Sequence, residues 1–327
     1  MGEDTGRQLA AGRAEKFSFA SWTIVYLLAA LFIFLALTRN AFFTFSNIHS
    51  ILHSVSFNFY AAIGFTLLII MGELDLSVGS MFGFGGAMMG FFIFMYKLPA
   101  PTAIALTIAA SALVGLASGF LIARFRLNSM MVTIGVMMAI KGVNWILVNR
   151  FSGRQFPASA RRFVSVDVLG IKWTIILMIA IALALEILLA KSRHLKQLYY
   201  IGHNFDTTIL YGLNANAVKC ACFAISAAMS AFGGVLMTAR LAHPNVTVGS
   251  NLEISIITAA VISGASIFGG RGSILRTMLG VTFVFTLQNG MTSYNINTYV
   301  QQIILGVILI LAIYLDIRAN SAAGERR

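Results

Sequence analysis

The chain has 327 residues, of which 58% are hydrophobic and only 10% are charged, and its mean hydropathy is +0.86. A soluble domain carries roughly 25% charged residues, so this composition excludes an ordinary soluble protein. The formal net charge of +12 would suggest a nucleic-acid partner in a soluble chain, but here the basic residues punctuate apolar segments. We read them as topology signals and expect no nucleic-acid binding.

Apolar runs of helix length predict an all-α integral membrane protein with about ten transmembrane helices, because a bilayer requires ~20 apolar residues per helix. The runs cover residues 20–38, 48–71, 77–96, 101–123, 129–149, 171–190, 218–239, 252–268, 273–291 and 299–316. The prolines fall in the predicted connections or, for Pro101, at the first position of a run, as helix breakers should. Together the runs define one membrane domain, 20–316.

Segments 1–19 and 317–327 flank this domain as polar tails. Segment 1–19 is mixed in charge, and no small-residue cleavage site follows it, which favours a retained first helix over a signal peptide. An even number of spans places both tails on one side of the membrane. More basic residues fall on that side, which predicts cytoplasmic termini, while Lys141 is left inside a span.

The stretch Gly72–Ser80 contains two acids, Glu73 and Asp75, between apolar runs with no other charged residue from Asn40 to Tyr96. Ionisable groups in hydrocarbon are costly unless they face protein, a polar partner or water. One interpretation is an interior path or a helix break, with Glu73, Asp75 and Ser77 as pathway or gating residues. The other is a short solvated loop between two helices.

Further pathway or gating candidates lie in or near other spans. They are Asn58, Asn144, Gln288 and Asn289, whose side-chain amides commonly bond across helices and only sometimes line a path. Glu253 lies in the first turn of the short run 252–268, which is flanked by glycines and is a candidate broken or re-entrant helix. We favour stabilisation of Glu253 by the helix dipole over a pathway role.

Neither a metal site nor a nucleotide site is predicted. His49 and His53 share a helix face but have no third ligand in view, which argues against bound metal. The chain also lacks a GxxxxGK[ST] phosphate-binding loop. Any ATP that drives this protein is therefore expected to bind another subunit.

Segment 191–217 is the longest predicted cytoplasmic connection, and it contains a short amphipathic helix signal. Asn204 or Asp206 can cap it, Phe205 and Ile209 share its apolar face, and Gly212 can end it. Such a helix connects spans, lies on the membrane surface or docks onto a partner. Spacing alone favours the connector.

Several motifs together resemble one family. Residues 72–80, GELDLSVGS, resemble the GGIDLSVGS signature of monosaccharide ABC transporter permeases, the ribose and xylose group of the branched-chain amino acid/sugar permease superfamily. The similarity continues in order through IGHN at 201–204, YGLN at 211–214, SGAS at 263–266 and GGRGS at 269–273. The chain departs from the pattern at Glu73 and His203, which replace glycines, and at Asn128–Ser129, where the family often has proline.

The resemblance implies a type II ABC importer permease-like fold with broken or re-entrant segments, in a bacterial inner membrane. The partners would be a second permease copy or paralogue, an ATP-binding cassette subunit, a periplasmic substrate-binding protein and membrane lipid. ATP and Mg would be used by the cassette subunit, while this chain would carry no catalytic residue, cofactor or metal. Segment 202–214 matches the family's ATPase-coupling region. The resemblance therefore favours docking onto the ATPase over a merely connecting role for this segment. The expected coupling residues are Gly202, Asn204, Phe205, Asp206, Ile209 and Gly212.

The expected function is ATP-driven import of a monosaccharide or related polyol by alternating access. Permeases of the same fold for nucleosides or branched-chain amino acids are an alternative. A different class is a proton-coupled secondary transporter, in which Glu73 and Asp75 carry the protons. In the importer interpretation, residues 72–80 have a structural or gating role and do not contact substrate directly.

Overall fold

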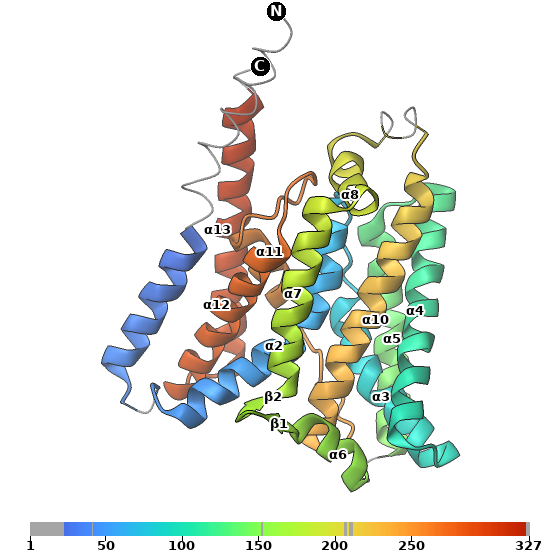
Figure 1. The fold of residues 1–327 in the computed structure, drawn as a ribbon, viewed down its shortest axis with the longest axis vertical. Helices are drawn as coiled ribbons and strands as arrows, with labels where there is room; N and C mark the ends of the chain where they lie inside the picture. The colour runs from blue at the N-terminus through green and yellow to red at the C-terminus, as the bar shows by residue number, and fades with distance from the viewer. Residues whose placement is uncertain (1–22, 41, 152, 206–207, 209–211, 325–327) are drawn as a thin grey trace, which may run out of the picture.

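The computed structural model describes residues 23–40, 42–151, 153–205, 208 and 212–324, and most of them are helical. An apolar helix, Thr23–Thr38, comes first. The remaining elements, in chain order, are α2 (Phe45–Ile70), α3 (Val78–Tyr96), α4 (Ala100–Phe125), α5 (Ser129–Arg150), α6 (Ala158–Ser165), β1 (Asp167–Val168), β2 (Ile171–Lys172), α7 (Trp173–Lys191), α8 (Arg193–His203), α10 (Ala215–Leu241), α11 (Leu252–Ile262), α12 (Ile274–Ser293) and α13 (Thr298–Gly324) (Figure 1).

Seven of the described helices are long and apolar enough to cross a membrane: α2, α3, α4, α5, α7, α10 and α13. The predicted count of ten is not confirmed, because the other three runs hold Thr23–Thr38, α11 and α12, which are shorter or more polar. The run 252–268 was predicted too long, since α11 ends at Ile262. Eleven residues rise only about 16 Å, roughly half a bilayer core.

A small hairpin departs from the all-α prediction. Strands β1 and β2 pair antiparallel, with Val168 opposite Ile171. The two residues between them, Leu169 and Gly170, both have positive φ, 54° and 79°, as a type I′ hairpin turn requires. Polar and β-branched residues at this connection thus form a structure that a search for long apolar runs does not detect.

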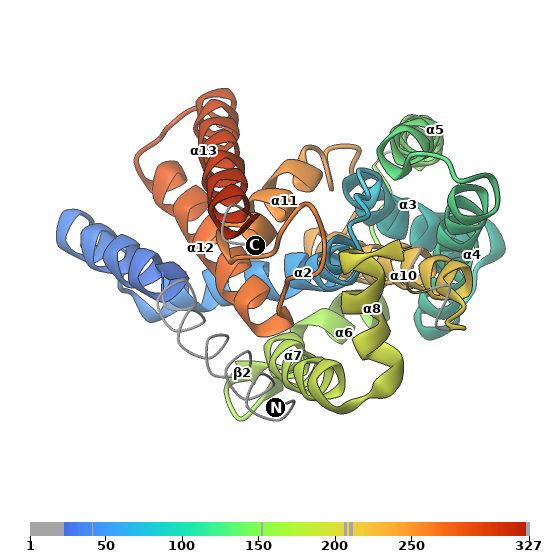
Figure 2. The same cartoon turned by 90° about the horizontal axis from the view of Figure 1, so that it is seen from above.

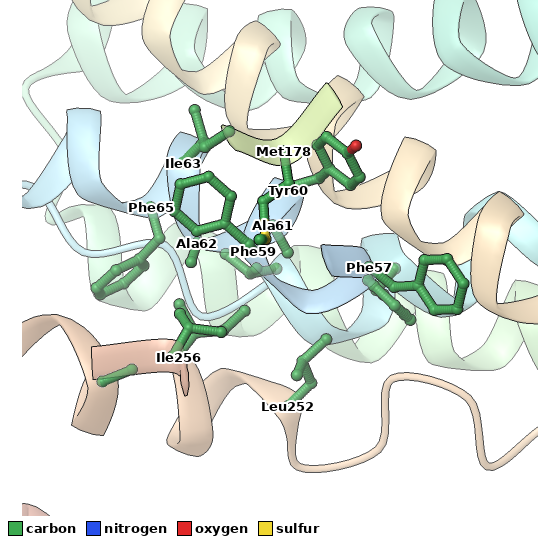
Figure 3. Packing of buried hydrophobic residues seen from close by; sticks show 14 of the residues in the cluster. Phe57, Phe59, Tyr60, Ala61, Ala62, Ile63, Phe65, Met178, Leu252 and Ile256 are labelled. Carbon is green, nitrogen blue, oxygen red and sulfur yellow. The ribbon is translucent and has the colours of Figure 1, made fainter. Parts of the chain in front are cut away.

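Helix α2 forms the centre of the molecule, with α3 and α10 on one side and α11 and α12 on the other (Figure 2). Phe57, Tyr60 and Phe65 are fully buried in it and pack with Met178 of α7 and Ile256 of α11 (Figure 3). An all-round apolar helix of this kind is expected in the interior of a bundle. The outer helices α4, α5 and α13 expose apolar side chains, as lipid-facing helices do.

The bundle has two distinct ends (Figure 1). Helix α8 lies at one end of α7, and the hairpin and α6 lie at the other. Helix α12 begins at the α8 end, because Ser273 donates to Glu186 near the end of α7 at 2.9 Å. The α12–α13 connection and the start of α11 therefore lie toward the hairpin end. We call these the α8 end and the hairpin end.

The chain breaks between α2 and α3. After α2 ends, residues 73–77 turn back along α10, so that Asp75 lies beside Ser226. Ser226 is eleven residues after Ala215, where α10 begins, or about 16 Å along the helix axis. The acidic stretch is thus a break enclosed by helices, and the solvated-loop interpretation is wrong.

Candidate functional site

The carboxylate of Asp75 lies in the break between α2 and α3 and is enclosed by protein, since Asp75 is 2% exposed. Its Oδ1 accepts hydrogen bonds from the Ser77 amide at 2.9 Å and the Ser77 hydroxyl at 2.6 Å. Its Oδ2 accepts one from the Ser226 hydroxyl of α10 at 2.9 Å. Both oxygens are therefore satisfied by neutral donors, which offset the cost of burying the group. Asp75 and Ser77 together fix the start of α3 against α10.

The start of α5 holds the other side of this break. The Leu74 amide donates to the Ser129 hydroxyl at 3.2 Å, and the Leu76 amide donates to the Thr133 hydroxyl at 3.1 Å. Asn128 caps α5 by accepting from the Met130 amide at 2.9 Å. The Asn128–Ser129 departure from the family pattern thus supplies a helix cap and an acceptor for the break.

Glu73 connects the break to the predicted coupling segment. Its carboxylate pairs with the Lys219 ammonium of α10 at 2.5 Å, and the two side chains are 15% and 11% exposed. The same ammonium lies 4.8 Å from the centre of the Phe205 ring, a cation–π distance. Lys219 therefore touches both a predicted gating residue and a predicted coupling residue.

Glycines Gly72, Gly202, Gly269 and Gly270 form a second connection, which we call the glycine junction. The Gly270 amide donates to Ile70, the last residue of α2, at 2.8 Å. Gly202 of α8 packs so closely here that a Cβ would overlap the Ile70 carbonyl oxygen. A Cβ on Gly270 would likewise overlap the ring of His203. The end of α8 is thus seated on the end of the central helix.

The remaining coupling candidates are described only in part. Asn204 ends α8, and its carbonyl accepts from the Thr208 amide at 3.2 Å. Gly212 has a φ of +76°, as expected of a residue that terminates a helical turn. Asp206 and Ile209 lie outside the described residues.

A separate polar cluster joins α3, α5 and α11. Glu253 of α11 is 8% exposed, and its Oε1 lies 3.5 Å from the Lys141 ammonium of α5. Asn144 donates to the Ser80 carbonyl of α3 at 2.9 Å. Gly79 makes room for the carboxylate, because a Cβ there would overlap Oε2 of Glu253. Glu253 has an interhelical cation partner in addition to its place in the first turn of α11, so the helix dipole alone does not account for it.

The other predicted amides do not converge on this cluster. Asn58 donates within α2, to the Ser54 carbonyl at 2.9 Å. Asn289 exchanges two amide hydrogen bonds with Asn47 of α2, at 3.3 and 3.2 Å. Gln288 donates to the Ser255 hydroxyl at 3.2 Å, and both lie at the hairpin end of the bundle. Of these three, Gln288 lines a cavity at this end of the bundle.

Two partners were not selected from the sequence as site residues. Lys219 was only one of many basic residues counted for topology, and Ser226 was one hydroxyl among several in an apolar run. Lys141 was noticed in the sequence because it is a charged residue inside a predicted span, but nothing in the sequence indicated that it pairs with Glu253. Within the described residues, no group of three metal-ligating side chains occurs.

This fold defines a polytopic α-helical membrane protein in which buried polar groups secure the helix breaks. Residues 47–313 match the family model described as branched-chain amino acid transport system/permease component, and the chain belongs to that family.

Several curated relatives are named as permeases for sugars. The chain is 29% identical to the ribose import permease protein of Escherichia coli K12 over 298 residues, which cover 90% of this chain and 92% of that protein. It is 33% identical to the L-arabinose ABC transporter permease protein of Azospirillum brasilense, over 90% and 86% of the two chains. It is 27% identical to the xylose transport system permease protein of Haemophilus influenzae, over 85% and 91%. No significant match was found among solved structures. The chain thus belongs to a family of transport-system permeases, and these relatives are named as permeases for sugars.

Proposed function

We propose that this chain is the transmembrane subunit of an ATP-driven importer for a monosaccharide or related polyol, and that it works by alternating access. Ribose, arabinose and xylose permeases of similar length are its relatives. The observation that carries the mechanism is the contact of Lys219 with both Glu73 and Phe205. It gives the coupling segment a direct mechanical connection to the break between α2 and α3.

In this proposal the partner ATPase binds the α8 end of a permease dimer in a bacterial inner membrane, with both termini cytoplasmic. ATP and Mg bind the ATPase, and a periplasmic binding protein delivers the sugar to the hairpin end. Closure of the ATPases displaces segment 202–214. The displacement reaches α2 through the glycine junction and reaches α3 through Glu73.

Two alternatives fit the contacts less well. In a proton-coupled transporter, Glu73 and Asp75 would bind and release protons. Asp75, however, is enclosed and its oxygens accept from three neutral donors, and Glu73 is paired with Lys219. A branched-chain amino acid permease agrees with the family's description. The sugar assignment rests on the relatives, which are named as permeases for ribose, arabinose and xylose.

Reconstitution tests the proposal. The permease is placed in proteoliposomes with its cognate ATPase and binding protein, and uptake of a sugar panel is measured with ATP inside. ATP-dependent uptake that survives a protonophore is the expected result. Uptake by the permease alone, driven by a proton gradient, would contradict it.

A further inference from the structure

A polar cavity of about 170 Å³ lies at the hairpin end, where α11 and α13 begin and α12 ends. Seven of the nine described residues that line it carry a hydroxyl or carboxamide group, among them Asn251, Ser255, Gln288, Gln301 and Gln302. The flanking helices are otherwise strongly apolar. Ser250, Thr298 and Gln302 are exposed, whereas Ser255 is buried, so the cavity is open to solvent on one side. A polar ligand can therefore replace water at its hydrogen-bonding groups.

The amides of the wall have distinct hydrogen-bonding capacities. Gln301 donates to the Ile296 carbonyl at 2.9 Å and to the Thr292 hydroxyl at 3.3 Å, so both donors of its amide are directed at protein and its carbonyl remains as an acceptor. Gln288 donates once, to Ser255, which leaves a second N–H and a carbonyl. The wall therefore offers both donors and acceptors.

Asn251 adds an independent observation. It occupies the N-cap position of α11, where asparagine usually accepts a hydrogen bond from the helix. Here it has a φ of +58°, and its side chain makes no cap hydrogen bond. Asn251 is instead one of the residues that line the cavity.

We propose that this cavity binds one neutral, polyhydroxylated molecule of monosaccharide size as it enters the permease. Among the described residues that line it, none is charged and none is aromatic. A zwitterionic amino acid would lack charged partners there, and a nucleoside base would lack a stacking surface. Hydroxyl groups match side chains that both donate and accept. At roughly 30 Å³ per water molecule the cavity has room for about five waters, or one small sugar in their place.

Binding at this site is expected to be weak. The wall lacks the aromatic and charged anchors that give tight complexes, and a transit site must release its ligand. The site also lies at the end opposite α8, which is the entry side if the proposed coupling segment faces the cytoplasm. The inference therefore rests on the proposed function for its direction of transport.

Two cavity variants and one control test the site. Gln288→Leu keeps the approximate side-chain size and removes the amide, and Ser255→Ala removes its hydroxyl partner. Asn149→Leu is the matched control, because Asn149 is an exposed amide on α5 that bonds only within its own helix, to the Trp145 carbonyl at 2.9 Å. Thermal unfolding confirms that each variant is folded. If Gln288→Leu does not fold, the binding and uptake measurements are made on Ser255→Ala.

The first measurement is saturation-transfer NMR on the permease in lipid nanodiscs, with D-ribose, L-arabinose, D-xylose, D-glucose and ribitol, and with L-leucine for comparison. We expect wild type and Asn149→Leu to bind at least one sugar or polyol in preference to leucine. Each cavity variant should bind that ligand about fivefold more weakly, since a lost hydrogen bond costs roughly 1 kcal/mol and about 1.4 kcal/mol corresponds to tenfold in affinity. Equal binding by wild type and cavity variants, or a preference for leucine, would overturn the inference.

The second measurement separates this inference from the proposed function. In proteoliposomes with the ATPase and the loaded binding protein, the maximal uptake rate should fall several-fold in Gln288→Leu and stay at the wild-type value in Asn149→Leu. ATP-driven sugar uptake that is equal in wild type and Gln288→Leu rejects the cavity and leaves the proposed function intact. Absence of ATP-driven sugar uptake in the wild-type assembly rejects the proposed function itself.

Discussion

The carboxylate of Glu73 lies 2.5 Å from the ammonium of Lys219, in a pair whose two side chains are almost fully enclosed. The pair joins the turn after α2 to the first turns of α10, next to Phe205. Such a pair adds little net stability, because desolvation opposes the attraction, but loss of one partner strands the other charge. It is therefore suited to fix the position of two segments relative to each other.

Lys219→Met removes the cation and leaves Glu73 without its partner. We expect the free energy of unfolding to fall by about 3 kcal/mol, as for other broken buried pairs. Stimulation of the partner ATPase by the loaded binding protein should fall several-fold, because Phe205 also loses its cation–π contact. Denaturation of the detergent-solubilised permease and ATPase assays of the assembly measure the two effects.

The double variant Glu73→Gln/Lys219→Met is the control for this prediction. It removes both charges, so its unfolding free energy should lie closer to wild type than that of Lys219→Met. If coupling depends on the connection and not on stability, ATPase stimulation should stay low in the double variant. Full stimulation there would contradict a coupling role for the pair.

Gly202 and Gly142 provide a matched pair of glycine substitutions. Gly202→Ala places a methyl group against the Ile70 carbonyl, so we expect a loss of folded protein or of ATPase stimulation. Gly142 lies in α5, and a methyl group added there would have no neighbouring atom within 4 Å. That change should stabilise the permease by roughly 0.5–1 kcal/mol, because alanine favours the helix. Expression, thermal unfolding and ATPase assays compare the two, and equal behaviour would contradict the close packing at the glycine junction.

Much of the bundle was predictable because membrane helices are local in origin. An apolar run satisfies its backbone within itself, so its length marks the helix, and α3 and α5 match their predicted runs to within a residue. Segments whose structure depends on distant partners were less predictable. Helix α8, which packs through Leu198 and Ile201, was not predicted as such, and α11 ends before its apolar run does.

The candidate site shows the same division. Sequence identified Glu73, Asp75 and Glu253, because a charge or carboxyl group in an apolar run is conspicuous. The cations that pair with Glu73 and Glu253 come from helices far away in the chain, and nothing local specifies which cation meets which acid. Interhelical pairing is a property of the packed bundle, so the partners became evident only from the structure.

Asp75→Asn tests whether Asp75 carries protons. Asparagine can still accept from Ser77 through its carbonyl, and its NH₂ can donate to the Ser226 hydroxyl, which then acts as an acceptor. We therefore expect a change in stability of at most about 1 kcal/mol and near-normal ATP-driven uptake. Asp75→Leu, which leaves Ser226 and the Ser77 amide without their acceptor, should be clearly destabilised. Loss of uptake in folded Asp75→Asn would favour a proton-carrying role.

Lys141 and Glu253 form a weaker pair, and the difference is measurable. Their atoms are 3.5 Å apart, the Lys141 side chain is 45% exposed, and Oε2 of Glu253 has no hydrogen-bond partner in the described structure. Lys141→Met should therefore destabilise the permease by only about 1–2 kcal/mol, less than Lys219→Met, because one carboxylate oxygen is already unsatisfied. Replacing the carboxylate as well, in Lys141→Met/Glu253→Gln, should recover most of that loss, since burying a neutral amide costs less free energy than burying an unpaired charge.

A double-mutant cycle of unfolding free energies gives the coupling energy between Lys141 and Glu253. A coupling energy near zero would mean that Lys141 does not compensate the charge of Glu253, and that the carboxylate at the start of α11 is held by the helix dipole alone.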